Sequence, residues 1–298
     1  MSRAPLALAL YPRAYLRAHG DEIAAHYAES TAGGPPAERW REEADLAGHA
    51  LRMRLRLTSG DPLGRVLAVA APYAATGAAV YAAVALVLLV RRVAWFSSDY
   101  GPSGLSLGLL TAADLILIGA GAAVLGGRWG VARGLALLGT AVLAVQHVAE
   151  GAYYLDGPSR LLSLVLSLAL VLGCPPDTPP AGRRMRTAAG VFGAVSLLML
   201  LAAVFLHALV LFVGIIGSVV PVLILSVTLA VAGPRSASPG AYAAGIGLAV
   251  LPWLTYFVQI LHWELDVAGL LVAMPATGAA VAWLRVRLAK GQEGLTRG

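Results

Sequence analysis

Charged residues are the scarcest feature of this chain. Only 13% of its 298 residues are charged and 58% are apolar, whereas an ordinary globular protein is about 25% charged. No Asp, Glu, Lys or Arg occurs in the 47 positions from 187 to 233. A membrane-spanning helix needs roughly 20 mostly apolar residues, so this run is long enough for two spans. The composition excludes an ordinary soluble protein and predicts an all-α, polytopic integral membrane bundle.

Cysteine and the motifs of soluble enzymes are also missing. Cys174 is the single cysteine, which excludes an intrachain disulfide and any metal site built from several cysteines. The sequence contains no His-Glu-x-x-His, no P-loop, no Gly-x-Ser-x-Gly elbow and no Gly-x-Gly-x-x-Gly placed after a strand. We therefore expect no cofactor and no catalytic residues. An ATPase, if the protein works with one, has to be a separate chain.

Basic residues are almost all arginine, with 21 Arg and a single lysine, Lys290. They give a net charge of +6, but aromatic residues are not interleaved with them on any one face of the soluble segments. Nucleic acid is therefore not an expected partner.

Residues 1–65 differ from the rest because they hold nine of the 22 basic and eight of the 16 acidic residues. The pattern predicts a cytoplasmic helical module with a helix over residues 5–18 and a second that starts at Asp21 after Gly20. Acidic side chains suit a helix N-terminus. The Gly-Gly-Pro-Pro segment within residues 30–36 predicts a loop, and a third helix is expected over residues 37–57.

Two surfaces are expected on this third helix and just after it. Trp40, Ala44, Leu51 and Leu55 recur at helical spacing and predict a buried stripe. Four arginines follow or overlap the stripe, namely Arg52, Arg54, Arg56 and Arg65. A basic patch beside a membrane attracts anionic lipid by roughly 1 kcal/mol per residue. The alternative is that these arginines only set the orientation of the first span.

One segment of the module resembles a known family. The run Leu10-Tyr11-Pro12-Arg13-Ala14-Tyr15-Leu16-Arg17-Ala18-His19-Gly20-Asp21-Glu22-Ile23 is similar to the permease-prefix module of bacterial membrane proteins. That module precedes the membrane region of some ABC-type permeases, and its genes often lie beside PadR-type regulators or ABC transporter components. The resemblance covers about 60 residues and implies a transport-linked or stress-response context. This chain has no large extracytoplasmic domain of the kind found in macrolide-exporter-type permeases.

The membrane domain is expected over residues 66–286, followed by a cytoplasmic tail over 287–298. Eight spans are predicted, at 66–90, 107–126, 133–153, 158–174, 187–207, 213–233, 240–261 and 267–285. The fourth is short and ends at Pro175-Pro176. A chain with seven spans and a re-entrant fourth segment is the alternative.

Arginine and lysine positions predict the orientation. With the N-terminus in the cytoplasm, 19 of the 22 basic residues lie inside, and only Arg91, Arg92 and Arg160 lie outside. This distribution follows the positive-inside rule and places both termini in the cytoplasm of a bacterial cell, with the spans in its inner membrane.

Internal similarity and small residues suggest how the spans pack. Val145-Gln146-His147 resembles Val258-Gln259 with His262, at an offset of 113 residues. This predicts two parallel halves, 66–174 and 187–286, unless the likeness is chance in an apolar alphabet. Gly119, Gly121, Gly126 and Gly127 are expected to allow close helix contact.

Polar groups within the spans are the candidate site residues, because an ionisable side chain in a bilayer costs roughly 2.5–3.5 kcal/mol. All lie in the predicted outer half of the membrane: Asp114, His147, Glu150, His207, Gln259 and His262. A proton relay would use Asp114 against His147. A metal site would use two or three of His147, His207, His262, Glu150 and Glu264, and a haem would need His147 with His207. The alternative is that Asp114 is paired within the protein and the others lie at the wet rim.

Three functions remain open at this point. The preferred one is a non-enzymatic membrane component of a transport or envelope-stress system, whose module contacts a membrane or ATPase partner. The second is a proton-coupled carrier for a small molecule that uses Asp114 and His147. The third is a membrane enzyme with its site at the outer rim, around His147, Glu150, His262 and Glu264.

Overall fold

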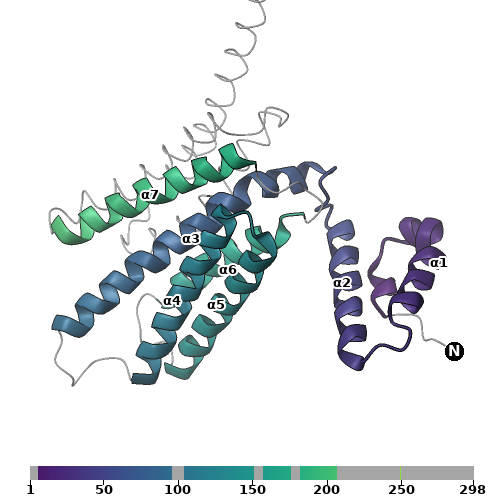
Figure 1. The fold of residues 1–298 in the computed structure, drawn as a ribbon, viewed down its shortest axis with the longest axis horizontal. Helices are drawn as coiled ribbons and strands as arrows, with labels where there is room; N and C mark the ends of the chain where they lie inside the picture. The colour runs from purple at the N-terminus through teal and green to yellow at the C-terminus, as the bar shows by residue number, and fades with distance from the viewer. Residues whose placement is uncertain (1–5, 96–103, 151–156, 176–181, 207–248, 250–298) are drawn as a thin grey trace, which may run out of the picture.

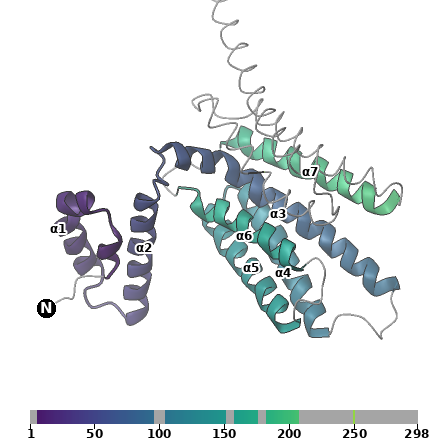
Figure 2. The same ribbon diagram turned by 180° about the vertical axis from the view of Figure 1, so that it is seen from behind.

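A computed structural model describes residues 6–95, 104–150, 157–175, 182–206 and 249. None of these residues lies in a strand. The elements are η1 (Leu6–Leu10), α1 (Arg13–Ser30), α2 (Pro36–Arg54), α3 (Pro62–Trp95), α4 (Gly104–Leu125), α5 (Trp129–Glu150), α6 (Gly157–Gly173) and α7 (Arg183–Leu206). Figures 1 and 2 show η1, α1 and α2 to one side of a bundle formed by α3 to α7. We call η1, α1 and α2 the N-terminal module.

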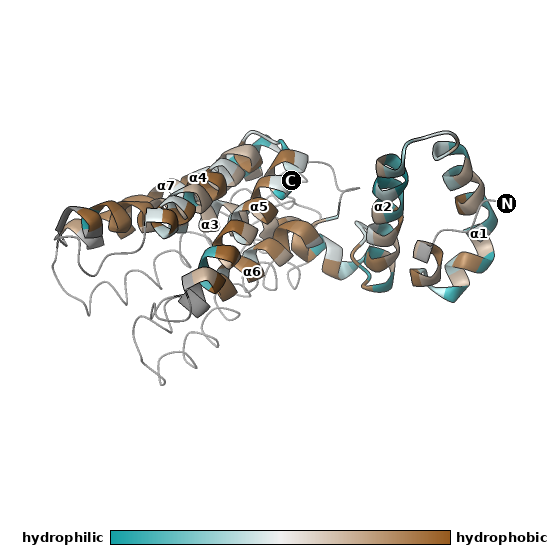
Figure 3. Cartoon of the chain, turned by 90° about the horizontal axis from the view of Figure 1, so that it is seen from below, coloured by the Kyte–Doolittle hydropathy of each residue, from teal (hydrophilic) through white to brown (hydrophobic). Residues whose placement is uncertain are grey.

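Four of the described helices are long and apolar enough to cross a membrane: Pro62–Arg91, Gly104–Leu125, Trp129–Ala149 and Arg183–Ala202. Figure 3 shows the same division, with hydrophobic colours on α3 to α7 and hydrophilic ones on much of α1 and α2. The expected helical membrane protein is confirmed at this level. Helix α6 is one uninterrupted apolar helix that packs against α3 and α5. The predicted spans at 213–233, 240–261 and 267–285 lie outside the described residues, apart from Ala249.

Small residues determine how closely the bundle helices approach one another. A Cβ on Gly121 of α4 would overlap Ala79 of α3, and one on Gly193 of α7 would overlap Thr76 of α3. A Cβ on Gly139 of α5 would come within 2.9 Å of Leu117 of α4. Without water to drive association, membrane helices gain from such close backbone contact. The expectation of close helix contact is confirmed at Gly121.

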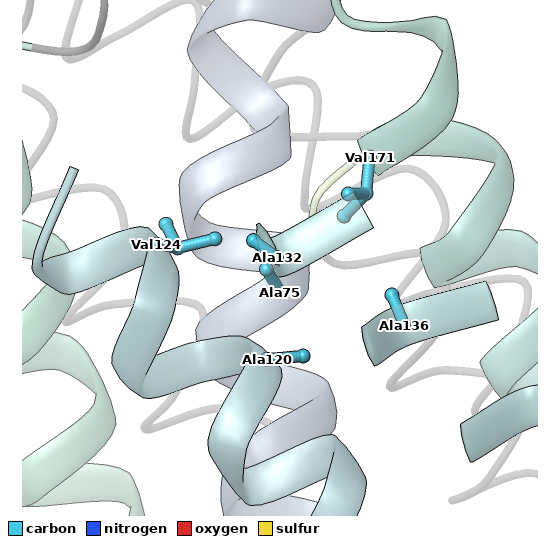
Figure 4. Close-up of a cluster of buried hydrophobic side chains, with 6 residues drawn as sticks. All are labelled: Ala75, Ala120, Val124, Ala132, Ala136 and Val171. Atoms are coloured by element: carbon cyan, nitrogen blue, oxygen red, sulfur yellow. The ribbon is translucent and has the colours of Figure 1, made fainter. Parts of the chain in front are cut away.

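The core of the bundle is accordingly built from short side chains. Figure 4 shows six of them converging from four helices, α3 to α6. They are Ala75, Ala120, Val124, Ala132, Ala136 and Val171. A second cluster contains Ala82, Ala113, Leu117, Leu143 and Leu164. Longer apolar side chains, such as Leu115, Val148 and Leu198, are exposed on the outside of the described bundle, where a bilayer would cover them.

Helix α3 is bent (Figures 1 and 2) and contains Pro72. A proline inside a helix removes one backbone hydrogen bond and is the usual cause of a bend. Near the bend, the Thr76 hydroxyl donates to the Pro72 carbonyl at 2.8 Å. The Tyr73 ring meets the Phe192 ring of α7 edge-on, with centroids 5.8 Å apart. The bent segment is thus joined to α7 by an aromatic contact.

The N-terminal module differs from its prediction at Gly20. A new helix was expected after this residue, but α1 runs unbroken from Arg13 to Ser30. A glycine inside a helix costs only about 1 kcal/mol relative to alanine, while two separate helices would leave more backbone groups unpaired. His19 Nδ1 lies 3.7 Å from a Glu22 carboxylate oxygen, and this contact bridges the glycine on the helix surface. The expected loop is confirmed, since α1 ends at Ser30 and α2 begins at Pro36.

Candidate functional site

The residues of the family-like motif form the centre of the N-terminal module. Tyr11 is 1% exposed, and its hydroxyl lies 2.8 Å from Nδ1 of His49 on α2. The Tyr11 ring stacks on Tyr15 at 5.6 Å, and Tyr15 contacts His19 at 4.7 Å between centroids. Burial raises the pKa of the Tyr11 phenol, with a further increase from Tyr15 and an opposing effect of Arg52. The aromatic residues of this motif therefore have a structural role, because they join η1 and α1 to α2.

The stripe predicted to be buried on α2 is exposed instead. Trp40 is 74% exposed, Leu51 54% and Leu55 52%, and Ala44 is exposed as well. The packed side of α2 is the one that carries Ala50, its only buried residue, and Arg54, whose guanidinium donates to the carbonyl of Ala9 in η1. The spacing was read correctly, but the small module covers only one side of α2. We call Trp40, Ala44, Leu51 and Leu55 the α2 stripe.

Charges of both signs border the α2 stripe. The first half of α2 contains Glu38, Glu42, Glu43 and Asp45, and its end contains Arg52 and Arg54. Around Trp40 these four acidic residues outnumber Arg39 and Arg41, whereas arginines border Leu51 and Leu55. A large apolar patch with a charged border is typical of a protein interaction site. The opposite charges at its two ends restrict which surfaces can bind there.

The four arginines expected to meet lipid are not equivalent. Arg54 holds η1 through the Ala9 carbonyl at 3.2 Å, and Arg52 is partly covered. Arg56 and Arg65 are exposed on either side of the short connection from α2 to α3. Arg56 has a positive φ of 54°, a conformation that seldom suits a residue with a Cβ.

Asp114 lies deep in the bundle and is 1% exposed. It stands seven residues before Gly121, so both residues lie on the stripe of α4 that faces α3. The apolar residues around it on α4 include Ala113 and Leu117 of the second core cluster. Asp114 has an interaction partner within the protein. A carboxyl group in this position is either a structural polar contact or a group that binds a proton or a cation.

The structure separates Asp114 from His147 along the bundle. Gln146 of α5 donates to Ser106 of α4 at 3.0 Å, and Gly139 lies against Leu117. In this register His147 lies level with the start of α4, about eight residues or roughly 12 Å along the axis from Asp114. His147 is half-buried. A direct proton transfer between these two side chains would need a bridging group.

The hydrogen bond between Ser106 and Gln146 was not expected from the sequence. Both side chains are buried, at 2% and 7% exposure. They join α4 to α5 at the end of the bundle where α3 ends, near Trp95. Gln146 is next to His147 in the sequence, but a proton relay needs titratable groups, and an amide side chain is not one. Its facing partner was visible only once the two helices were aligned.

The bundle contains a small cavity of about 10 Å³. Its lining is apolar apart from Thr140 and Ser167, whose hydroxyls donate to the carbonyls of Ala136 and Ser163 on their own helices. The volume is about that of a single water probe. This cavity is too small for a substrate.

Other predicted site residues lie outside the described part of the chain. These are the Glu150 side chain, His207, Gln259, His262 and Glu264. Within the described residues no group of three His, Cys, Asp or Glu side chains is placed to hold a metal ion. All the expected metal and haem ligands except His147 are therefore among the residues or side chains that the structure does not describe.

At the opposite end of the bundle from His147, arginines surround the helix ends. Gly127 ends α4 with a φ of +77°, and Arg128 N–H donates to the Ala123 carbonyl at 2.8 Å. This is the Schellman pattern of a glycine-terminated helix. The Arg186 guanidinium of α7 lies directly over Gly127, where a Cβ would collide with it. Arg133 of α5 donates to the carbonyls of Val171 and Cys174 at the end of α6.

The arginines at this end therefore divide into two groups. Arg133 binds the last carbonyls of α6, where the negative end of the helix dipole lies. Arg128, Arg183 and Arg184 are exposed, and Arg186 keeps a buried Nε that has no hydrogen-bond partner among the described residues.

Comparison with protein-family models, with curated proteins and with solved structures finds no match to this chain, so its function has to be inferred from its own residues.

Proposed function

We propose that this chain is a non-enzymatic membrane component of a transport or envelope-stress system and that its N-terminal module binds a partner protein. The observation that carries the proposal is the exposure of the α2 stripe, above all of Trp40 at 74%. Exposing a tryptophan and two leucines to water is unfavourable by roughly 1.5–3 kcal/mol for each large side chain. A partner that covers them recovers this free energy.

The charges beside the α2 stripe favour a protein over the membrane surface as its partner. An anionic bilayer would attract the arginines near Leu55 but would repel the segment around Trp40, where four carboxylates outnumber Arg39 and Arg41. An amphipathic helix or groove with the opposite charge order, basic beside Trp40 and acidic beside Leu55, satisfies both halves. This is the chemistry we assign to the partner. The contact of Arg56 and Arg65 with anionic lipid remains a separate prediction.

The orientation belongs to the same proposal. With 19 basic residues on one side, the module and the tail face the cytoplasm, and the spans lie in a bacterial inner membrane. The resemblance of the Tyr11 motif to a permease-prefix module supports a permease or its ATPase as the partner.

Affinity purification from native membranes tests the proposal. The full chain, tagged after Gly298, is purified with and without Trp40→Asp and Leu51→Asp, and co-eluting proteins are quantified by mass spectrometry. We expect a stoichiometric partner with the wild type. The amount of this partner that co-elutes should fall at least tenfold with the double variant, since both hot-spot side chains are removed. The matched control introduces the same two charges on the exposed surface of α1, as Ala25→Asp and Ala28→Asp, and should retain the partner.

Cross-linking from position 40 then identifies what covers the α2 stripe. A partner segment with basic residues near Trp40 is the expected product. A chain that purifies alone, or a partner retained fully by the Trp40→Asp, Leu51→Asp variant, contradicts the proposal.

A proton-coupled carrier is the second candidate, and the burial of Asp114 favours it. A carboxyl group that is 1% exposed within an apolar bundle is costly and is a functional hypothesis for that reason. A carrier loses transport in Asp114→Asn and keeps its module contacts. A partner-binding component shows the reverse, with Asp114→Asn silent and removal of residues 1–60 abolishing the complex.

A further inference from the structure

The arginines at the helix ends opposite His147 have no role in the function proposed above. We call Arg128, Arg183, Arg184 and Arg186 the arginine patch. Arg128 follows Gly127 in the turn between α4 and α5, and the other three lie in the first turn of α7. The position of the Arg186 guanidinium over Gly127 brings these two elements together.

Within the described residues the positive charge of the patch is not balanced by an ion pair. None of the four side chains makes an ion pair with a carboxylate among the described residues. Within residues 104–150 and 182–206 the only acidic residues are Asp114 and Glu150, and both lie away from this end of the bundle. Asp61, which precedes α3 at this end, accepts a hydrogen bond from the Thr58 hydroxyl. Asp177, in the connection before α7, is outside the described residues. Arg183 and Arg186 are three apart and share one face of α7, so Arg183 extends the patch beyond the turn.

Two further features favour an anion at this place. The N-terminus of α7 carries the positive end of its helix dipole. The buried Nε of Arg186 is a donor that has no partner among the described residues, and a charged donor left unpaired is costly. Arg133 provides the contrast, because the carbonyls of Val171 and Cys174 already occupy its guanidinium.

We infer that the arginine patch binds the phosphate of an anionic phospholipid. The patch lies where the apolar helix α4 ends and the apolar helix α7 begins, which is the level of lipid headgroups in a bilayer. The positive-inside rule assigns this end to the cytoplasm, and basic pockets between spanning helices on that side suit anionic headgroups. The exposed apolar surfaces of the helices provide the contact for the acyl chains. This lipid would join α7 to the α4–α5 turn.

Lipid titration of the full chain in detergent tests the inference. Short-chain phosphatidylglycerol is the probe, phosphatidylcholine is the uncharged comparison, and inorganic phosphate is the soluble one. Binding is measured by native mass spectrometry and by the lipid-dependent rise in Tm. We expect phosphatidylglycerol to bind, with little effect of the other two.

Arg128→Gln, Arg183→Gln and Arg184→Gln together remove three exposed charges. At roughly 1 kcal/mol for each arginine, affinity should fall about fivefold per residue and about a hundredfold in all. The matched control removes three exposed arginines of the N-terminal module, as Arg13→Gln, Arg17→Gln and Arg39→Gln, and should keep wild-type affinity. If the triple variant does not fold, Arg128→Gln alone should show the fivefold loss.

Three outcomes overturn the inference. Unchanged affinity in the patch variant means that the lipid binds elsewhere. An equal loss in the control means that only net charge matters. Binding of inorganic phosphate as tight as that of phosphatidylglycerol means that the patch is a site for a soluble anion. All three leave the partner-binding proposal untouched, because its variants lie on α2.

Discussion

Apolar side chains are exposed in both the N-terminal module and the bundle, but the exposure has different meanings. In the bundle, Leu115, Val148 and Leu198 are exposed on helices that belong in lipid. In the module, Trp40 and Leu51 are exposed on a helix that also carries eight charged residues. The same solvent exposure is expected of a membrane span, whereas on a charged helix it is the observation from which we propose a binding surface.

The two regions also differ in what holds them together. The module depends on one large buried side chain, Tyr11, with its hydrogen bond to His49. The bundle depends on many short side chains, and on glycines such as Gly121 that let backbones approach. A single substitution should therefore damage the module more than the bundle.

The largest expected effect is that of Tyr11→Ala in the module. Removing a buried aromatic side chain typically costs about 3–5 kcal/mol, which is enough to unfold a unit with one short 3-10 helix and two α-helices. Trp40→Ala, a change of similar size at an exposed position, should alter stability by less than about 0.5 kcal/mol. Hydrogen exchange of α1 and α2 in the full chain measures both. Equal protection in the two variants would show that Tyr11 is not the centre of the module.

Arg133→Met should have the next largest effect, and it acts on the bundle. The change leaves the carbonyls of Val171 and Cys174 without their charged donor, at a cost of about 1.5–3 kcal/mol. Arg128→Met is the control, because the exposed Arg128 side chain makes no such bond. Thermal unfolding in lipid-free detergent compares the two variants. An identical Tm for both would contradict the capping role of Arg133.

Gly121→Val tests the close approach of α3 and α4. The added side chain would overlap Ala79 and lie near the Ala75 carbonyl, and overpacking of this kind costs about 1–3 kcal/mol. Gly134→Val on α5 serves as the control, since a Cβ there meets nothing within 4 Å. The readout is the fraction of protein that stays monodisperse on heating. If both variants lose folded protein equally, the loss comes from placing valine in a helix and not from the close approach of α3 and α4.

The smallest effect concerns pH. Because burial raises the pKa of Tyr11 in the folded module, its contribution to stability is fully present below pH 10, near the pKa of an unperturbed phenol. It is lost as the pH rises from there through the folded pKa. Module stability should thus fall more steeply at alkaline pH in the wild type than in Tyr11→Phe. Tyrosinate absorbance and hydrogen exchange record the two quantities, and parallel pH profiles would exclude the effect.

Local chemistry was sufficient for much of the fold. The Gly-Gly-Pro-Pro segment predicted the loop before α2, which begins at Pro36. Apolar runs predicted the four helices that are long enough to span a membrane, α3, α4, α5 and α7, and the shorter apolar helix α6. The prediction that a helix starts after Gly20 was wrong, because a single glycine is a weak helix breaker and the residues on both sides favour helix.

The candidate site was less accessible to prediction. Asp114 could be placed within a span from its apolar neighbours, and the structure places it in the core at 1% exposure. Its separation from His147 depends on the register of α4 against α5, which Ser106 and Gln146 define. Periodicity identified the α2 stripe but not whether it was covered, since that depends on how many other elements pack around α2.

Hydropathy and charge, which act locally, were enough to establish a helical membrane protein with a charged front segment. Burial of a stripe, pairing of a polar side chain and occupation of an arginine are properties of contacts between distant residues. Tertiary structure alone decided that Arg133 caps α6 while Arg128 stays exposed, although the two stand five residues apart in the same arginine-poor sequence. The physical reason is that each guanidinium binds whatever acceptor the packing brings within reach, and no local pattern encodes that acceptor.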